Sequence, residues 1–234
     1  MSILLSTFIS SFASLLVAFY FLYRWVRQKP KNNSTLAWFL GFLVYSMTQA
    51  FSGILHSGLY AMPTGTYNNL NVIRCLLVNM FFMFIFWGTI RLIFRRRLII
   101  YGVTILGFIL ANLIVIFANN LTNNDLNAVK LISYLIYLPA GIIFFGIFLV
   151  LYGVLVAESV KRKYGITLII VSWLIYIILS LALPSLYQSH FDYWYLGRGI
   201  STLILLLGFI IMEREARQAF VDFNEDMKLH HHFK

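Results

Sequence analysis

Arg198 stands inside an apolar run, and its charge there suggests a binding role. The stretch YWYLGRGIST (193–202) opens the last long apolar segment and places the guanidinium about five residues inside it, ~8 Å at the helical rise. A guanidinium at membrane depth is costly without a partner. Its fork of N–H donors suits a carboxylate, which accepts two parallel hydrogen bonds. We therefore expect Arg198 to bind an anion and Asp192 to orient it.

Arg74 takes a similar place at the start of an earlier apolar run, and we expect it to assist Arg198. Aromatic and imidazole side chains are dense near this end of the predicted helices. Those expected to complete a ligand site with the two arginines and Asp192 are Trp194, His56, Tyr176 and Tyr45. A purely structural interpretation stays open, in which the arginines reach water along the helix ends and the rings form an interfacial belt.

The residues needed for most enzyme chemistry are missing from the apolar runs. Carboxylates stand only near the ends of the runs, and the sequence contains no H-E-x-x-H motif. The last run contains no lysine that could hold retinal as a Schiff base. We therefore expect no catalytic site, no metal and no cofactor.

The composition predicts an all-α integral membrane protein. The 234 residues are 61% hydrophobic and only 11% charged, and a bilayer core of about 30 Å needs roughly 20 apolar residues per helix. We expect a seven-helix transmembrane domain over 1–212 and a short cytoplasmic amphipathic helix or tail over 213–234. The seven runs are Ile3–Tyr23, Leu36–Leu55, Arg74–Phe94, Leu98–Ala118, Val129–Val156, Ile166–Leu186 and Tyr193–Met212.

The basic residues predict the orientation. Of the 18 lysines and arginines, all but Arg74, Lys130 and Arg198 follow runs 1, 3, 5 and 7. Positive loops stay in the cytoplasm, so we expect the N-terminus outside, the C-terminus inside and a location in the cell membrane. This rule accounts for the net charge of +10, and no nucleic-acid partner is needed to explain it.

Two parts of the chain resemble each other weakly. Residues 38–60, WFLGFLVYSMTQAFSGILHSGLY, align with 169–191, IIVSWLIYIILSLALPSLYQSHF, which places Tyr45 opposite Tyr176. Arg74 and Arg198 then take matching positions in the runs that follow. A repeat of this kind would give two parallel three-helix units joined by run 4, with a binding site at their interface.

The segment after Met212, EREARQAFVDFNEDMKLHHHFK, carries apolar residues at helical spacing. Three interpretations stay open. The segment lies on the inner membrane surface, extends the last helix straight into a short dimeric coiled coil, or frays.

The plan of seven spans followed by a charged helix resembles the seven-helix N-terminal sensor region of bacterial histidine kinases. The segments WFLGFLVYSMTQAF and NVIRCLLVNMFFMFIFWGTIRLIF are similar in character to spans 2 and 3 of that family, although no kinase domain follows here. The resemblance implies a receptor-like protein, with a cytoplasmic signalling partner or a homodimer. Together with the arginines it predicts a small acidic or amphipathic ligand in an outward-facing pocket and a signal carried by the extension of the seventh helix. The alternatives are a small-solute transporter of three-plus-one-plus-three helix architecture and an accessory subunit of a membrane complex.

Overall fold

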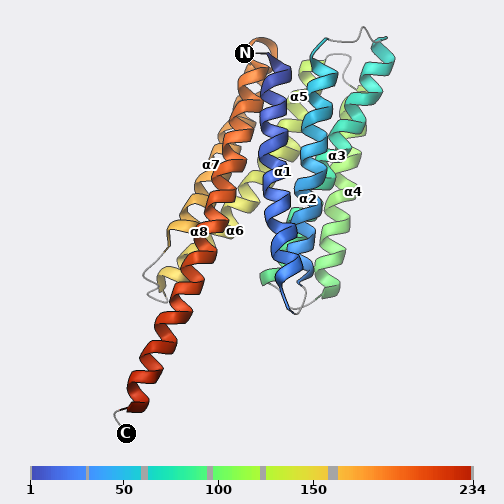
Figure 1. Cartoon of the computed structure of the whole chain (residues 1–234). Helices are drawn as coiled ribbons and strands as arrows, with labels where there is room; N and C mark the ends of the chain where they lie inside the picture. The colour runs from blue at the N-terminus through green and yellow to red at the C-terminus, as the bar shows by residue number, and fades with distance from the viewer. Residues whose placement is uncertain are drawn as a thin grey trace.

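The computed structural model describes residues 2–29, 32–58, 63–93, 97–121, 125–157 and 163–232, which form helices joined by short links. The helices run alternately up and down a bundle, so that the N-terminus lies beside the start of the last helix (Figure 1). In chain order they are α1 (Ile3–Arg27), α2 (Asn33–His56), α3 (Thr64–Ile93), α4 (Arg97–Leu121), α5 (Asp125–Ile132), the π-helix η1 (Ser133–Tyr137), α6 (Leu138–Ala157), α7 (Tyr164–Ser189) and α8 (Phe191–His232).

Seven helices among the described residues are long and apolar enough to cross a membrane, with α5, η1 and α6 counted as one. Each predicted run falls on one of them, so the all-helical prediction is confirmed. One boundary was wrong: the third helix begins at Thr64, whereas its apolar run was predicted to begin at Arg74. The intervening residues are helical and the candidate span begins at Gly65, so Arg74 lies well inside α3.

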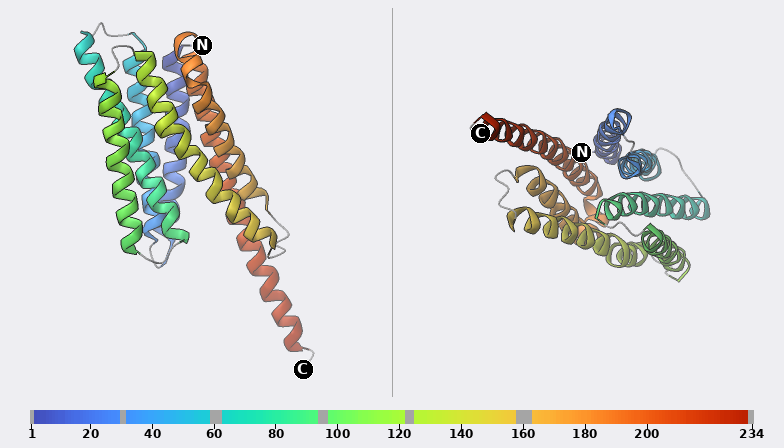
Figure 2. Two further views of the ribbon diagram at one scale, coloured as in Figure 1. Left: turned by 180° about the vertical axis from the view of Figure 1, so that it is seen from behind. Right: turned by 90° about the horizontal axis from the view of Figure 1, so that it is seen from below.

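Neighbours in sequence are neighbours in the bundle, and α8 closes it by packing against both α7 and α1. Close approach at these contacts requires glycine. A Cβ on Gly199 of α8 would lie 3.1 Å from the Cα of Ser10 on α1. By contrast α4 lies at the edge (Figure 2) and exposes a row of large apolar side chains, Ile105, Leu106, Ile109, Leu113, Ile116 and Phe117.

Two pairs of serines fasten antiparallel neighbours. Ser11 of α1 and Ser46 of α2 each donate a hydrogen bond to the other's backbone carbonyl, both at 2.9 Å. Ser172 of α7 and Ser201 of α8 do the same, both at 2.8 Å. Each hydroxyl reaches across to the next helix where it has little access to water, so these pairs fix the register of α1 on α2 and of α7 on α8.

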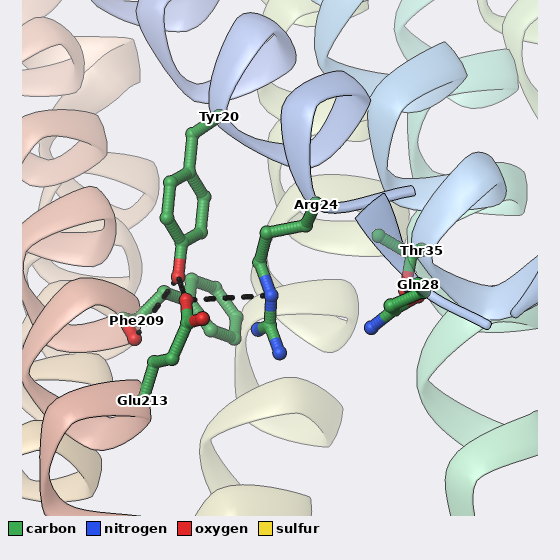
Figure 3. A network of polar contacts seen from close by, with 6 residues as sticks. All are labelled: Tyr20, Arg24, Gln28, Thr35, Phe209 and Glu213. Carbon is green, nitrogen blue, oxygen red and sulfur yellow. Dashed lines mark hydrogen bonds and ion pairs between the residues drawn. The ribbon is translucent and has the colours of Figure 1, made fainter. Parts of the chain in front are cut away.

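A polar cluster at the end of the bundle opposite the N-terminus fixes where α8 leaves it (Figure 3). The hydroxyl of Tyr20 on α1 donates to Glu213 Oε2 at 2.7 Å, and Arg24 Nε lies 3.4 Å from the same oxygen. Two residues further along α8, Glu215 accepts hydrogen bonds from the backbone N–H groups of Tyr164 and Gly165 at 3.0 and 3.2 Å. Because the first N–H groups of a helix have no intrahelical partner, Glu215 acts as a cap for α7.

Beyond this cluster α8 continues without interruption to His232 and projects from the bundle (Figure 1). Three interpretations of the final segment were left open. This continuous helix agrees with the one in which the segment extends the last helix straight. The coiled-coil dimer that was coupled to it stays a prediction.

A proline and a π-helix meet at the contact between α7 and η1. Pro184 has no N–H, so the carbonyl of Ser180, four residues earlier, loses its helical donor. The hydroxyl of Ser133, the first residue of η1, donates to that carbonyl. Pro139 is the second residue of α6 and also lacks an N–H, and the wider turn of the preceding π-helix accommodates this second interruption.

Candidate functional site

Arg198 lies in a box of aromatic rings at the centre of the bundle. It is only 2% exposed. Its guanidinium carbon lies 3.7 Å from the ring centroid of Tyr176 on α7 and 4.4 Å from that of Trp194 on α8. Tyr137 of η1 is at 5.5 Å, and Nη1 donates to the hydroxyl of Tyr45 on α2 at 3.3 Å. Four elements therefore meet at one cation, whose charge is stabilised chiefly by π-faces.

One edge of the guanidinium has no hydrogen-bond partner among the described residues. Nη1 donates to Tyr45, but the buried Nε and Nη2 atoms make no hydrogen bond within that part of the chain. These two nitrogens share one edge of the planar group, the edge that holds a carboxylate through two parallel bonds. Burying donors without an acceptor costs free energy, so this edge is suited to binding an anion.

The expected partnership between Asp192 and Arg198 takes a different form. Asp192 is largely buried in the first turn of α8, where the helix dipole favours a carboxylate. Among the described residues, the ring and hydrogen-bond contacts of Arg198 are with Tyr45, Tyr137, Tyr176 and Trp194. Asp192 lies almost two turns before Arg198 on the same helix, and the predicted orientation of Arg198 by Asp192 stays a prediction.

Arg74 also points into the protein. It is 7% exposed, and its Nε donates to Asn71 Oδ1 at 2.9 Å while Nη2 contacts Cys75 Sγ at 3.5 Å. The third basic residue outside the predicted cytoplasmic clusters, Lys130, is exposed. The two arginines are thus buried in the interior, whereas snorkelling to water would have left them exposed.

Two small cavities flank the box. The first touches Arg198, Tyr45 and Tyr176, and the second touches Arg74, Tyr137 and Trp194. Each has a volume of about 20 Å³, which is room for about one water molecule. An outward-facing pocket was predicted here, and the spaces found beside the two arginines among the described residues are these two narrow ones. Ring packing fills the remainder, since Phe191 stacks on Trp194 at 5.6 Å.

His56 lies beside the site without touching Arg198. Its Nδ1 is 3.0 Å from the hydroxyl of Tyr67, and its ring packs edge-on against Phe191 at 5.1 Å. Phe191 in turn stacks on Trp194, so His56 supports the wall of the box through Phe191. The structure thus brings together Arg198, Tyr45, Tyr176 and Trp194 from the predicted set.

Sequence reasoning missed Tyr137. Its run is apolar throughout, so periodicity gives no inward face, and the π-turn shifts the register of every side chain from Ser133 onward. The one available signal was the nearby Pro139, which the sequence places in the middle of a predicted span. The arrangement is suited to binding an anion, and among the described residues no three His, Cys, Asp or Glu side chains gather to hold a metal ion.

Comparison with protein-family models, with curated proteins and with solved structures finds no match for this chain.

Proposed function

We propose that this chain is a multi-pass membrane protein that senses a small anionic or amphipathic ligand and reports its presence through α8. The seven helices span the bilayer, with the N-terminus outside and the C-terminus in the cytoplasm. One observation carries the proposal. The free Nε and Nη2 edge of buried Arg198 belongs to the same helix that extends out of the bundle to His232.

The ligand's carboxylate accepts hydrogen bonds from Nε and Nη2, replacing part of the stabilisation that the aromatic rings supply. The two flanking cavities of about 20 Å³ are too small for a carboxylate with a hydrocarbon tail. Binding therefore requires Trp194 or Tyr176 to move, and these rings lie on α8 and α7. The ligand thereby favours a different packing of α8 on α7, which is the differential affinity that a sensor needs.

We favour sensing over solute transport for the same reason. A transport route needs a continuous polar passage, whereas the spaces beside Arg198 each hold about one water molecule. The apolar exposed surface of α4 is that of a helix in contact with lipid. A cytoplasmic signalling partner or a second copy of the chain receives the signal at the α8 extension.

Binding of an anionic probe tests this function. Decanoate is titrated into the purified full chain by calorimetry. Decyltrimethylammonium, a cation with a tail of similar length, is the control. Arg198→Gln should weaken decanoate binding roughly 10- to 100-fold, because a charge-assisted pair of bonds is lost. Lys130→Gln, which removes an exposed cation, should leave it unchanged. Equal binding by both variants would exclude Arg198 as the site.

A further inference from the structure

A third and larger cavity is lined by other residues, and Arg198 is not among them. It has a volume of about 350 Å³ and lies between α3, α4 and the segment formed by η1 and α6. Its lining is apolar almost throughout and includes Phe82, Met83, Ala111, Ile136 and Ile143. No charged side chain is among the described residues that line it, so it is unsuited to a charged head group.

One buried acceptor belongs to a residue of this lining. Asn79 of α3 is 2% exposed and lines the cavity. Its Nδ2 donates to Asn112 Oδ1 on α4 at 2.9 Å, while its own Oδ1 is buried and has no donor among the described residues. A buried amide oxygen left without a donor is costly, so a ligand group with one hydrogen to donate is favoured there.

A further hollow continues the space along α4. It has a volume of about 410 Å³, and the described residues that line it are all apolar, including Leu113, Ile116 and Phe117. The two spaces share Leu110, Ile114 and Leu135 as walls. Together they offer an elongated apolar surface that begins at one polar atom.

We propose that this cavity binds a membrane-dissolved long-chain alcohol, aliphatic or isoprenoid, whose hydroxyl donates to Asn79 Oδ1 and whose hydrocarbon tail lies along α4. An alcohol satisfies the acceptor and brings no charge into the apolar lining. The proposal goes beyond the sensing function and does not depend on Arg198; it shares with that function only the insertion of the helices in a membrane.

Photocrosslinking of the full chain tests the site. The probe is hexadecanol carrying a diazirine on its tail, applied to the protein in phosphatidylcholine vesicles. Crosslinks located by peptide mass spectrometry should fall on the residues lining the two hollows. Unlabelled hexadecanol should compete about tenfold better than hexadecyl methyl ether, which keeps the tail and lacks the donor.

Two leucine substitutions on α4 form a matched pair. A Cβ at Gly107 or at Gly102 meets no atom within 4 Å, so neither position clashes, but only Gly107 lines the cavity. Gly107→Leu should reduce crosslinking severalfold, and Gly102→Leu should leave it unchanged. In Asn79→Leu the alcohol should lose its advantage over the ether.

Crosslinks spread evenly over the exposed apolar surface, or equal competition by alcohol and ether, would overturn the proposal. Equal labelling of the two leucine variants would also overturn it, and this arm does not depend on the folding of Asn79→Leu. Decanoate binding measured in Arg198→Gln separates this outcome from failure of the sensing function, because Arg198 does not line this cavity.

Discussion

The ring centroid of Tyr176 on α7 lies 3.7 Å from the guanidinium carbon of Arg198 on α8. The guanidinium lies over the face of the ring, and by geometry the buried Tyr176 hydroxyl has no hydrogen-bond partner among the described residues. The two tyrosines that the weak internal similarity placed in matching positions therefore serve the same cation in different ways. Tyr45 supplies an acceptor, and Tyr176 supplies a π-face.

This difference predicts unequal effects of one substitution at two sites. Tyr45→Phe removes the acceptor for Nη1 and should lower the free energy of unfolding by about 1–3 kcal/mol, since a buried charged donor loses its partner. Tyr176→Phe keeps the ring and removes a hydroxyl without a partner, so it should change stability by less than about 0.5 kcal/mol. Thermal unfolding of the purified variants in one detergent measures both, and equal losses would contradict the assignment.

The bond from Ser133 to the Ser180 carbonyl depends on Pro184, which predicts coupling between the two sites. Ser133→Ala alone should destabilise the protein by about 1 kcal/mol, because a buried carbonyl loses its donor. In the Pro184→Ala background the new N–H satisfies the same carbonyl, and Ser133→Ala should cost little. A double-mutant cycle from unfolding measurements gives the coupling energy. Additive losses would show that the proline does not free this carbonyl.

Close contact between α7 and α8 predicts that Gly208 tolerates no side chain. A Cβ there would lie 2.9 Å from the carbonyl oxygen of Gly165 and 3.0 Å from the Ile169 nitrogen, both backbone atoms that cannot rotate away. Gly208→Leu should destabilise by about 1–3 kcal/mol or more. Gly146→Leu on α6 is the control, because a Cβ there meets no atom within 4 Å. Similar unfolding temperatures for the two variants would contradict the packing.

The Glu215 cap predicts a local change in hydrogen exchange. Glu215→Ala leaves the Tyr164 and Gly165 N–H groups without their acceptors, so these amides should exchange faster while the middle of α7 is unchanged. Exchange followed by mass spectrometry over the first turns of α7 measures this. Glu215→Gln keeps an oxygen acceptor and should show a smaller effect. Unchanged hydrogen exchange in the alanine variant would contradict the role of Glu215 as the cap of α7.

The proposed topology is tested by accessibility of cysteines in a Cys75→Ser background. His190→Cys lies at the end of the bundle that contains the N-terminus, and Tyr164→Cys lies at the opposite end; both native side chains are exposed. A membrane-impermeant maleimide should label the first in intact cells and the second only after permeabilisation. The reverse pattern would invert the topology.

The sequence was sufficient for the seven helices, because each span is a run of apolar residues long enough to be read from composition. It also singled out Arg198 as a charge inside an apolar run but left open whether that charge reaches water, and the structure buries it. It placed the start of α3 at Arg74 because the polar turns that precede it carry no apolar signal, although they are helical from Thr64.

The shape of the space around Arg198 could not be read from the sequence. Ring packing by Phe191 and Trp194 fills the expected pocket, and such packing depends on side-chain orientation. Tyr137 reaches the site because a π-turn rotates it inward, and Asn79 faces a cavity formed by three helices distant in sequence. Both depend on tertiary packing that periodicity does not encode.

The central claim is that an anion bound at Arg198 changes the packing of α8 and thereby the mobility of the α8 extension. A spin label on Gln218→Cys, again in a Cys75→Ser background, reports on α8 beyond the Glu213 and Glu215 contacts. Decanoate should change the mobility of this label in the otherwise unchanged chain, should do so weakly in Arg198→Lys, and should have no effect in Arg198→Gln. An identical spectral response in the chain with Arg198 and in Arg198→Gln, or no response in either, would contradict the account.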